Sequence, residues 1–449
     1  MNKVMNIRNK IMVYSLLGST VFHPVYGSSG PDTLLAIEGA VDYAVRYNLT
    51  MQSVNNKYES SLSDLGSARQ TLLPTAQASL SANRRQSLDD RASTTSSASV
   101  SAGADYSFSP SRYRYYLAAK KSNTAMQHDV EEQRKEIAAQ TLIQFVKVAG
   151  AARLIAVEED NVAYQKRKTE EIDALFGQGI KARSDVLQQR VNSADANTGL
   201  LDAVRQYRLQ MLSLLDIMGL PPADRYKIDT TAMAKVLSFC SEDMSPGLLA
   251  NRETDGIVGQ KFRVATAQAT LEGRRLAYIP SISFSAGWSA GDDIDKDLGN
   301  DVSGSLQAGV SIGVPILDQR QRRIQIDNAG ISLRQEKIEL DRMRQTLDLA
   351  IEQALLDDEM ARSRTIVSSA KCEASQEALD AMEERYRAGA STLVELNAVQ
   401  KDNVSARIDL VQARFDCITS RMEVLRQTGH IDLIIDFLKK TSGEQEVKE

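Results

Sequence analysis

Two kinds of apolar spacing alternate along this chain. Four segments place an apolar residue at every second position, with serine and glycine at most of the positions between, which is typical of strands with one apolar and one polar face. These segments are 75–83, 98–108, 281–289 and 302–314. Two longer tracts, 112–219 and 320–428, instead place apolar residues three and four positions apart among Glu, Gln, Lys and Arg. That spacing predicts amphipathic helices.

The prolines support long helices in these two tracts. No proline occurs from 111 to 220 or from 316 to 449, and proline is the residue that breaks helix interiors. In each tract we expect one helix to run outward, a turn at a glycine, and a second helix to return. At 1.5 Å per residue the outgoing helices, about 112–176 and 320–388, would be roughly 100 Å long. A compact globule has no room for helices of that length.

The second half of the chain repeats the first at an offset of about 210 residues. Matching pairs include Gly179 with Gly389, Asp185 with Glu395, and Gly219 with Gly429. The period is too long for a solenoid repeat and indicates duplication of one large unit. The expected divisions are a first repeat at 28–220, a connector at 221–252, a second repeat at 253–429 and a C-terminal segment at 430–449.

The amino terminus has the layout of a cleavable signal peptide over 1–27. Lys3, Arg8 and Lys10 precede an apolar run at 11–22, and small residues follow before Gly27. The apolar run is about 12 residues, too short to span a bilayer as a helix. Export of the mature chain is therefore predicted.

In an exported chain, the four alternating segments have the length and the two unlike faces of transmembrane β-strands. A soluble sandwich is the alternative, but each strand pair leads into a helix of about 100 Å. Four strands do not close a barrel, and unpaired strand edges do not face lipid. We therefore expect several chains to share one barrel, and about 12 strands would require three copies.

No catalytic or metal-binding motif is found. The chain has three histidines, lacks a nucleophile elbow and metal-spaced Cys/His sets, and carries a net charge of -5 without a basic aromatic patch. No enzymatic activity, cofactor or nucleic-acid partner is predicted. Cys240, Cys372 and Cys417 are odd in number and widely spaced, so they are not a disulfide framework. If the second turn centres near residue 390, Cys372 and Cys417 lie about 13 Å out of register and should be free thiols.

The order strand, loop, strand, long helix, turn, helix, given twice, resembles the TolC-like outer-membrane factors of Gram-negative envelopes. The motifs that carry the resemblance are LLPTAQASLSA, YIPSISFSAGW, GVPILDQRQRR, LFGQGIKARSDVLQQ and RYRAGASTLVELNAVQ. One departure is a second hairpin tip that is one residue shorter than usual between Gly389 and Ala398. The resemblance implies a mainly α protein with membrane β-structure. In it a homotrimeric 12-stranded barrel continues into a periplasmic α-helical tunnel, with a collar built from the connector and the C-terminal segment.

The resemblance also implies a function and partners. The chain would be the outer-membrane exit duct of a tripartite efflux or type I secretion system, in contact with outer-membrane lipid and extending far into the periplasm. Its partners would be a periplasmic adaptor (a membrane fusion protein) and an inner-membrane transporter of the RND, ABC or MFS class. The cargo and the transporter class remain open. An exported coiled-coil structural protein without a pore is the alternative, and the long helices argue against a passive porin.

Candidate functional residues lie in two regions. Asp185 and Glu395 follow the hairpin turns, where a tapered tunnel would be narrowest, so they would ring its mouth; solvated acids at helix N-termini are the alternative. Tyr386 resembles a family position that holds the mouth closed, with Asp185 as its acceptor, and Arg183 or Arg387 could pair with the acids. Gly179 and Gly389 mark the tips that would meet the adaptor.

An aromatic girdle at the membrane interfaces is expected, with Trp288 at the rim opposite the others, although the stretch at 112–116 could instead form a carbohydrate or nucleic-acid patch. The girdle residues are Tyr106, Phe108, Tyr113 and Trp288.

Overall fold

The computed structural model describes most of the chain beyond the expected signal peptide. The described residues are 33–86, 94–223, 226–229, 233, 236, 252–293, 303–314 and 320–437. The expected signal peptide at 1–27, the thiol of Cys240 and most of the inter-repeat connector lie outside these residues.

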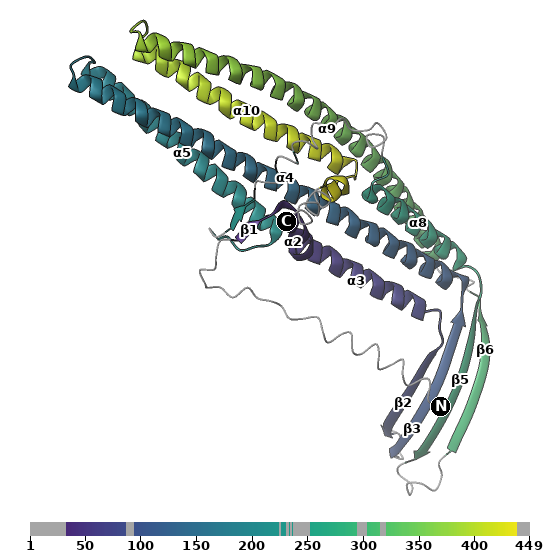
Figure 1. Cartoon of the computed structure of the whole chain (residues 1–449). Helices are drawn as coiled ribbons and strands as arrows, with labels where there is room; N and C mark the ends of the chain where they lie inside the picture. The colour runs from purple at the N-terminus through teal and green to yellow at the C-terminus, as the bar shows by residue number, and fades with distance from the viewer. Residues whose placement is uncertain are drawn as a thin grey trace, which may run out of the picture.

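A four-stranded sheet lies at one end of the elongated molecule and two long helical hairpins at the other (Figure 1). The strands pair antiparallel in the order β2-β3-β5-β6. Each half of the chain supplies two neighbouring strands and one hairpin, which confirms the duplicated strand–strand–helix–helix unit. The strands are β2 (Thr75–Gln86), β3 (Thr94–Phe108), β5 (Ser281–Asp293) and β6 (Ser303–Gly313).

Three of the strands run beyond the segments expected from the sequence. β2 continues past residue 83 to Gln86, β3 begins at Thr94 rather than at 98, and β5 continues past 289 to Asp293. The expected bounds followed the apolar alternation, which stops earlier than the pairing. Backbone hydrogen bonds hold the ladder, so polar residues extend it where the partner strand is also present.

The pairing register places like residues opposite one another on both faces of the sheet. Ala102 lies opposite Trp288, which lies opposite Leu306, so one face is apolar across the strands. The other face carries hydroxyls: Ser79 and Ser101 hydroxyls lie 2.7 Å apart. The Ser289 and Ser305 hydroxyls, in the same row, lie 2.8 Å apart. A one-residue slip would exchange the two faces, so the pattern fixes the register.

The four long helices form two hairpins. The first is α4 (Pro110–Gly177) with α5 (Arg183–Met218), and the second is α9 (Gln321–Arg387) with α10 (Leu393–Gln427). α4 has 68 residues and α9 has 67, so each is roughly 100 Å long. α4 begins with Pro110 directly after β3, a position where the missing N–H of proline costs nothing.

Three shorter helices precede the strand pairs and were not anticipated from the sequence. They are α2 (Ile37–Tyr47), α3 (Leu49–Gln70) and α8 (Asp255–Leu276). α3 packs on α4, and α8 lies between α4 and α9. α3 fully buries only Met51, and its other inward positions, Val54, Tyr58, Leu65 and Ala68, are only partly buried, so its apolar stripe is weak.

The elements lie side by side in one layer with two unlike edges. Near the sheet the helix order α3-α4-α8-α9 follows the strand order β2-β3-β5-β6. Farther out the order is α5-α4-α10-α9. One edge of the layer is therefore made by β2, α3 and α5, and the other by β6 and α9.

The main core lies where the two hairpins, the amino-terminal elements and the C-terminal segment meet. Here β1 (Thr33–Leu35) pairs in parallel with β4 (Tyr226–Ile228). Phe145 and Leu214 are fully buried beside Ile434 of the C-terminal segment. β1 and α2 thus contribute to this core beside the described parts of the connector and the C-terminal segment.

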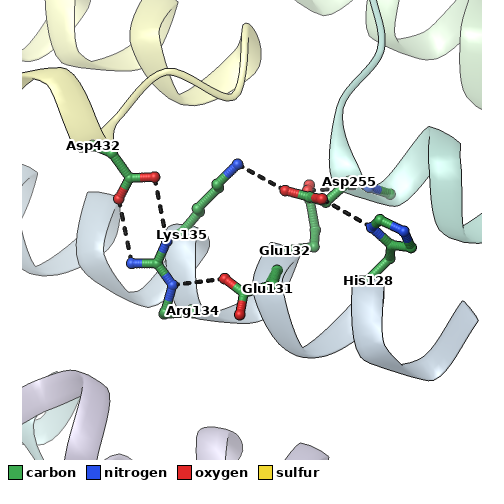
Figure 2. A network of polar contacts seen from close by, with 8 residues as sticks. His128, Glu131, Glu132, Arg134, Lys135, Asp255 and Asp432 are labelled. Atoms are coloured by element: carbon green, nitrogen blue, oxygen red, sulfur yellow. Dashed lines mark hydrogen bonds and ion pairs between the residues drawn. The ribbon is translucent and has the colours of Figure 1, made fainter. Parts of the chain in front are cut away.

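A polar network fastens α8 and the C-terminal segment to α4 (Figure 2). Asp255, the first residue of α8, accepts from Lys135 Nζ at 2.7 Å and lies 3.0 Å from His128 Nδ1. Thr254 gives no side-chain cap, and Glu132 of α4 instead accepts the free backbone N–H of Gly256 at 3.2 Å. Arg134 holds Asp432 of the C-terminal segment at 3.2 Å.

Candidate functional site

The two hairpin tips have the same length and the same backbone geometry. Five residues join each helix pair, 178–182 in the first and 388–392 in the second. Gly179 and Gly389 have φ of 77° and 73°, a conformation that favours glycine, and each directly follows the residue that caps its helix. Within the chain the second tip is therefore no shorter than the first, and its turn centres at residue 390 as expected.

The two helices that leave the tips begin differently. In α10, Thr392 Oγ1 accepts from the Glu395 N–H at 3.2 Å, and Glu395 Oε2 accepts from the Thr392 N–H at 3.0 Å. This reciprocal pair is a capping box. In α5 the same place is held by Ala182, which gives no side-chain cap, and Asp185 occupies the position equivalent to Glu395.

A small core joins the two hairpins near their tips. Tyr386, at the end of α9, is only 6% exposed and packs with Ile172 of α4 and Val186 of α5. Lys181 Nζ lies 4.4 Å from the centre of its ring and Lys168 Nζ 5.3 Å, which are cation–π distances. Both lysines come from the first hairpin, so the ring of Tyr386 is a contact between hairpins.

Aromatic side chains gather where β3 passes into α4. Tyr106 stacks on Phe284 with ring centres 6.4 Å apart. Phe108 and Tyr113 are about half exposed. Trp288 is also exposed, but it does not mark the opposite end of its strand, because β5 continues from Trp288 to Asp293. The place of Trp288 at the opposite rim of the membrane band stays a prediction, because barrel strands can extend beyond that band.

Comparison with known proteins relates this chain to one family. The family model for outer membrane efflux proteins matches residues 252–430, which span the second repeat. The second repeat is therefore similar to the outer membrane efflux proteins. The chain is 24% identical over 315 residues to the outer membrane efflux protein BepC of Brucella suis, covering 70% of this chain and 68% of that protein.

Further similarities extend over most of the chain. It is 24% identical over 385 residues to the pyoverdine export outer membrane protein OpmQ of Pseudomonas aeruginosa, covering 80% of this chain and 77% of that protein. The fold matches the CmeC outer membrane channel of Campylobacter jejuni with a TM-score of 0.76 at 16% identity, covering 90% and 89% of the two chains. These findings confirm the resemblance and the fold class inferred from the sequence.

The tip residues named from the sequence are the first candidates for function, and the structure gives them different surroundings. Tyr386 Oη is buried without a hydrogen-bond partner and does not reach Asp185 within the chain. Arg387 pairs with Glu383 at 2.9 Å, one turn back on α9, rather than with either acid. Arg183 is the exposed first residue of α5. Glu395 is held in its capping box.

Lys168 and Lys181 are the contacts that sequence reasoning missed. Lys168 is almost fully buried and also pairs with Glu171 at 2.8 Å. The sequence around Lys168 is rich in charged residues, so it does not indicate that this lysine is buried. Its burial depends on how the second hairpin packs against the first. The position of Lys181 in the turn between α4 and α5 was a weak indication that it could contact the other hairpin.

Neither a metal site nor a clear membrane-spanning helix is found in the described part of the chain. No group of three His, Cys, Asp or Glu side chains there is placed to hold a metal ion. α4 contains one stretch long and apolar enough to cross a bilayer, but 56% of that stretch is buried against other elements. A buried core helix meets the same criterion, so this stretch is weak evidence for a span.

Proposed function

We propose that three copies of this chain form an outer-membrane exit duct that conducts substrate passively from the periplasm to the outside. The duct would consist of a shared barrel of about 12 strands and a helical tunnel. The observation that carries the proposal is the single layer of elements with two unlike edges. The outer membrane is the location of the family, and the fold is that of its channels.

The sheet supports closure between copies. Its apolar face leaves Leu306 82% exposed, a surface that lipid would cover. Among the described residues, nothing pairs with the outer edges of β2 and β6. Unpaired backbone groups are costly in lipid, so β6 of one copy would pair with β2 of the next. A head-to-tail contact of this kind closes into a ring when the rotation fits.

The helical edge supports the same closure. α9 exposes an apolar stripe near the sheet at a seven-residue spacing, formed by Ile324, Ile331 and Ile338 at 56%, 44% and 66% exposure. Such a stripe is typical of a helix that packs against another helix. Because the helix order follows the strand order, α3 of the next copy would lie against this stripe when β2 pairs with β6.

We further propose that the duct works with a periplasmic adaptor and an inner-membrane transporter, in efflux or in type I secretion. One relative is named as an efflux protein and another as an export protein. The chain carries no phosphate-binding loop, so energy would come from the transporter. Gly179 and Gly389 form the ends of the helical hairpins farthest from the sheet, where an adaptor would dock.

The mouth of the tunnel is proposed at the same tips. Asp185 and Glu395 are the third residues of α5 and α10, so three copies would supply up to six carboxylates at one level. Tyr386 would keep the two hairpins together through the lysines over its ring.

A matched pair of arginine substitutions tests the membrane-inserted barrel. Leu306→Arg places a charge on the apolar face of β6, whereas Gln307→Arg places the same charge on the other face one residue away. At the centre of a bilayer such a charge costs about 2–4 kcal/mol on the lipid face, and little in a water-filled bore. We therefore expect Leu306→Arg to reduce the heat-resistant trimer extracted from outer membranes severalfold, and Gln307→Arg to leave its yield close to wild type.

The alternative, an exported structural protein without a pore, gives a different result. If the sheet were a soluble cap, both variants would be recovered in the periplasmic fraction without detergent. That result, or equal trimer yields for the two variants, would contradict the exit duct.

A further inference from the structure

The polar face of the sheet, opposite the apolar face of Trp288 and Leu306, is almost free of charge. We consider the rows between the row of Ser81 and the row of Ser107, which pair across the sheet in a continuous register. Asp105 is the only ionisable residue among the described side chains on the polar face of these rows. The others are Thr75, Gln77, Ser79, Ser81, Ser99, Ser101, Gly103, Ser107, Ser283, Ser285, Gly287, Ser289, Gly291, Ser305, Gln307, Gly309 and Ser311.

Asp105 lies at the level of the apolar band. On β3 the apolar stripe extends from Val100 to Phe108, about 26 Å along the strand, which at the tilt of barrel strands spans about 20 Å of the roughly 25 Å apolar band. Asp105 lies within this stretch and is exposed. An ionisable group at this depth is costly unless it faces water, so it marks a solute path.

No cation on the sheet neutralises this carboxylate. In its row Asp105 lies opposite Thr75 on one side and Ser285 on the other. Arg85 is ten residues beyond Thr75 on β2, about 33 Å along the strand and several Debye lengths away. Arg112 lies in the first turn of α4 and donates to the backbone carbonyl of Ser107 at 2.8 Å, at the end of β3.

We propose that Asp105 gives the bore of the barrel a preference for cations and for cationic groups of larger cargo over anions. The proposal rests on the proposed trimer, in which three Asp105 carboxylates stand at one level in an otherwise hydroxyl-lined wall. A ring of like charges in a bore with low-dielectric walls concentrates counter-ions. The second repeat places Ser285 and Gly309 in this row, so each chain contributes one carboxylate.

Thiol labelling of the full-length protein in outer membranes tests this from the cell surface, whatever the state of the periplasmic mouth. Cys240, Cys372 and Cys417 are first replaced by serine. Ser285→Cys then places a thiol directly opposite Asp105. Membrane-impermeant cationic and anionic methanethiosulfonates are compared by their rates of reaction. We expect the cationic reagent to be favoured about tenfold at this position, because the carboxylate lies within a Debye length. Asp105→Asn should bring the ratio close to the intrinsic ratio of the two reagents.

Ser81→Cys is the matched control, since it lies on the same face six residues beyond Thr75, about 20 Å along the strand. Its ratio should not change with Asp105→Asn. An unchanged ratio at Ser285→Cys, or equal changes at both positions, would overturn the role of Asp105 while leaving the duct intact. If Val100→Cys on the apolar face reacts and neither polar-face cysteine does, the proposed bore itself is wrong.

Discussion

At the residue scale, the two hairpin tips differ in one capping interaction. Thr392 and Glu395 form a capping box, whereas Ala182 leaves the same place in α5 uncapped. Loss of a threonine cap costs about 1 kcal/mol, roughly a fivefold change in local opening. Thr392→Ala should therefore speed amide exchange in the first turn of α10 about fivefold. Ala182→Ser should slow exchange in the first turn of α5.

Exchange measured on the trimer by mass spectrometry provides the readout, and each variant serves as the control for the other hairpin. Equal exchange in wild type and Thr392→Ala would show that contacts other than the cap hold the tip.

The role of Glu395 in the cap was open in the sequence, because an acid three residues after a threonine is equally compatible with a mouth residue. The burial of Lys168 could not be inferred at all, since it depends on a residue about 218 positions away.

The register of the two cysteines was predictable, because it follows from helix geometry alone. Cys372 and Cys417 are free thiols in the structure. Lys371 pairs with Asp409 at 2.7 Å, so the chain beside Cys372 is level with residue 409 and not with 417. Burial raises the pKa of the Cys417 thiol, and the nearby Asp358 raises it further. Its thiolate is therefore scarce at neutral pH.

At the element scale, periodicity predicted the long helices and the strands and missed α2, α3 and α8. The long helices repeat one spacing over dozens of residues, whereas the apolar stripe of α3 is short and only partly buried within one chain. Its partner on the exposed side would belong to a second copy. The position of α8 depends on a polar network with α4 (Figure 2), which no local pattern reveals.

This network gives a prediction for α8. Burial alone would raise the pKa of Asp255, but hydrogen bonds from Lys135 and His128 outweigh it and hold the pKa below its usual value. The ion pairs then stabilise the fold above the unfolded pKa, near 4, and the stabilisation is lost as the pH falls through the lower folded pKa. Asp255→Asn should cost about 1 kcal/mol at pH 7, since the group is partly exposed.

The measurement is the thermal midpoint of the helical circular dichroism signal at pH 7 and near pH 3. The difference between wild type and Asp255→Asn should shrink at the lower pH. Asp402→Asn, at an exposed position of α10 that is not at an edge of the layer, should behave as wild type at both. A constant difference between wild type and Asp255→Asn would assign the loss to packing rather than to charge.

At the scale of the whole molecule, the single-layer arrangement explains why one chain is incomplete. Alternation and strand count already required a shared barrel, because four strands leave two edges open. The structure adds which edges would meet, since β6 and α9 lie on one side and β2, α3 and α5 on the other. The sequence could not supply this lateral order, because it depends on how the second repeat packs beside the first.

The mouth prediction belongs to this scale, because its contacts would run between copies. Tyr386 Oη is buried and has no hydrogen-bond partner among the residues that the structure describes, whereas a buried hydroxyl normally finds one. We expect the partner to be Asp185 of a neighbouring hairpin in the assembled trimer. Asp185→Ala combined with Tyr386→Phe should then loosen the mouth and raise single-channel conductance in planar bilayers severalfold.

Glu395→Ala should weaken block by divalent cations from the periplasmic side, because it removes three carboxylates from one ring.

Tyr386→Phe alone separates the two roles of this residue. The ring and its contacts with Lys168 and Lys181 remain, so the packing between hairpins should be retained and only the hydroxyl lost. If the hydroxyl bonds across copies, the single variant raises conductance part of the way; if it bonds nothing, the variant conducts as wild type. Lys181→Met is the complementary variant, since it removes a cation from the ring and leaves the hydroxyl. Properly trimeric variants that all conduct as wild type, with unchanged divalent block, would place the gate elsewhere in the tunnel.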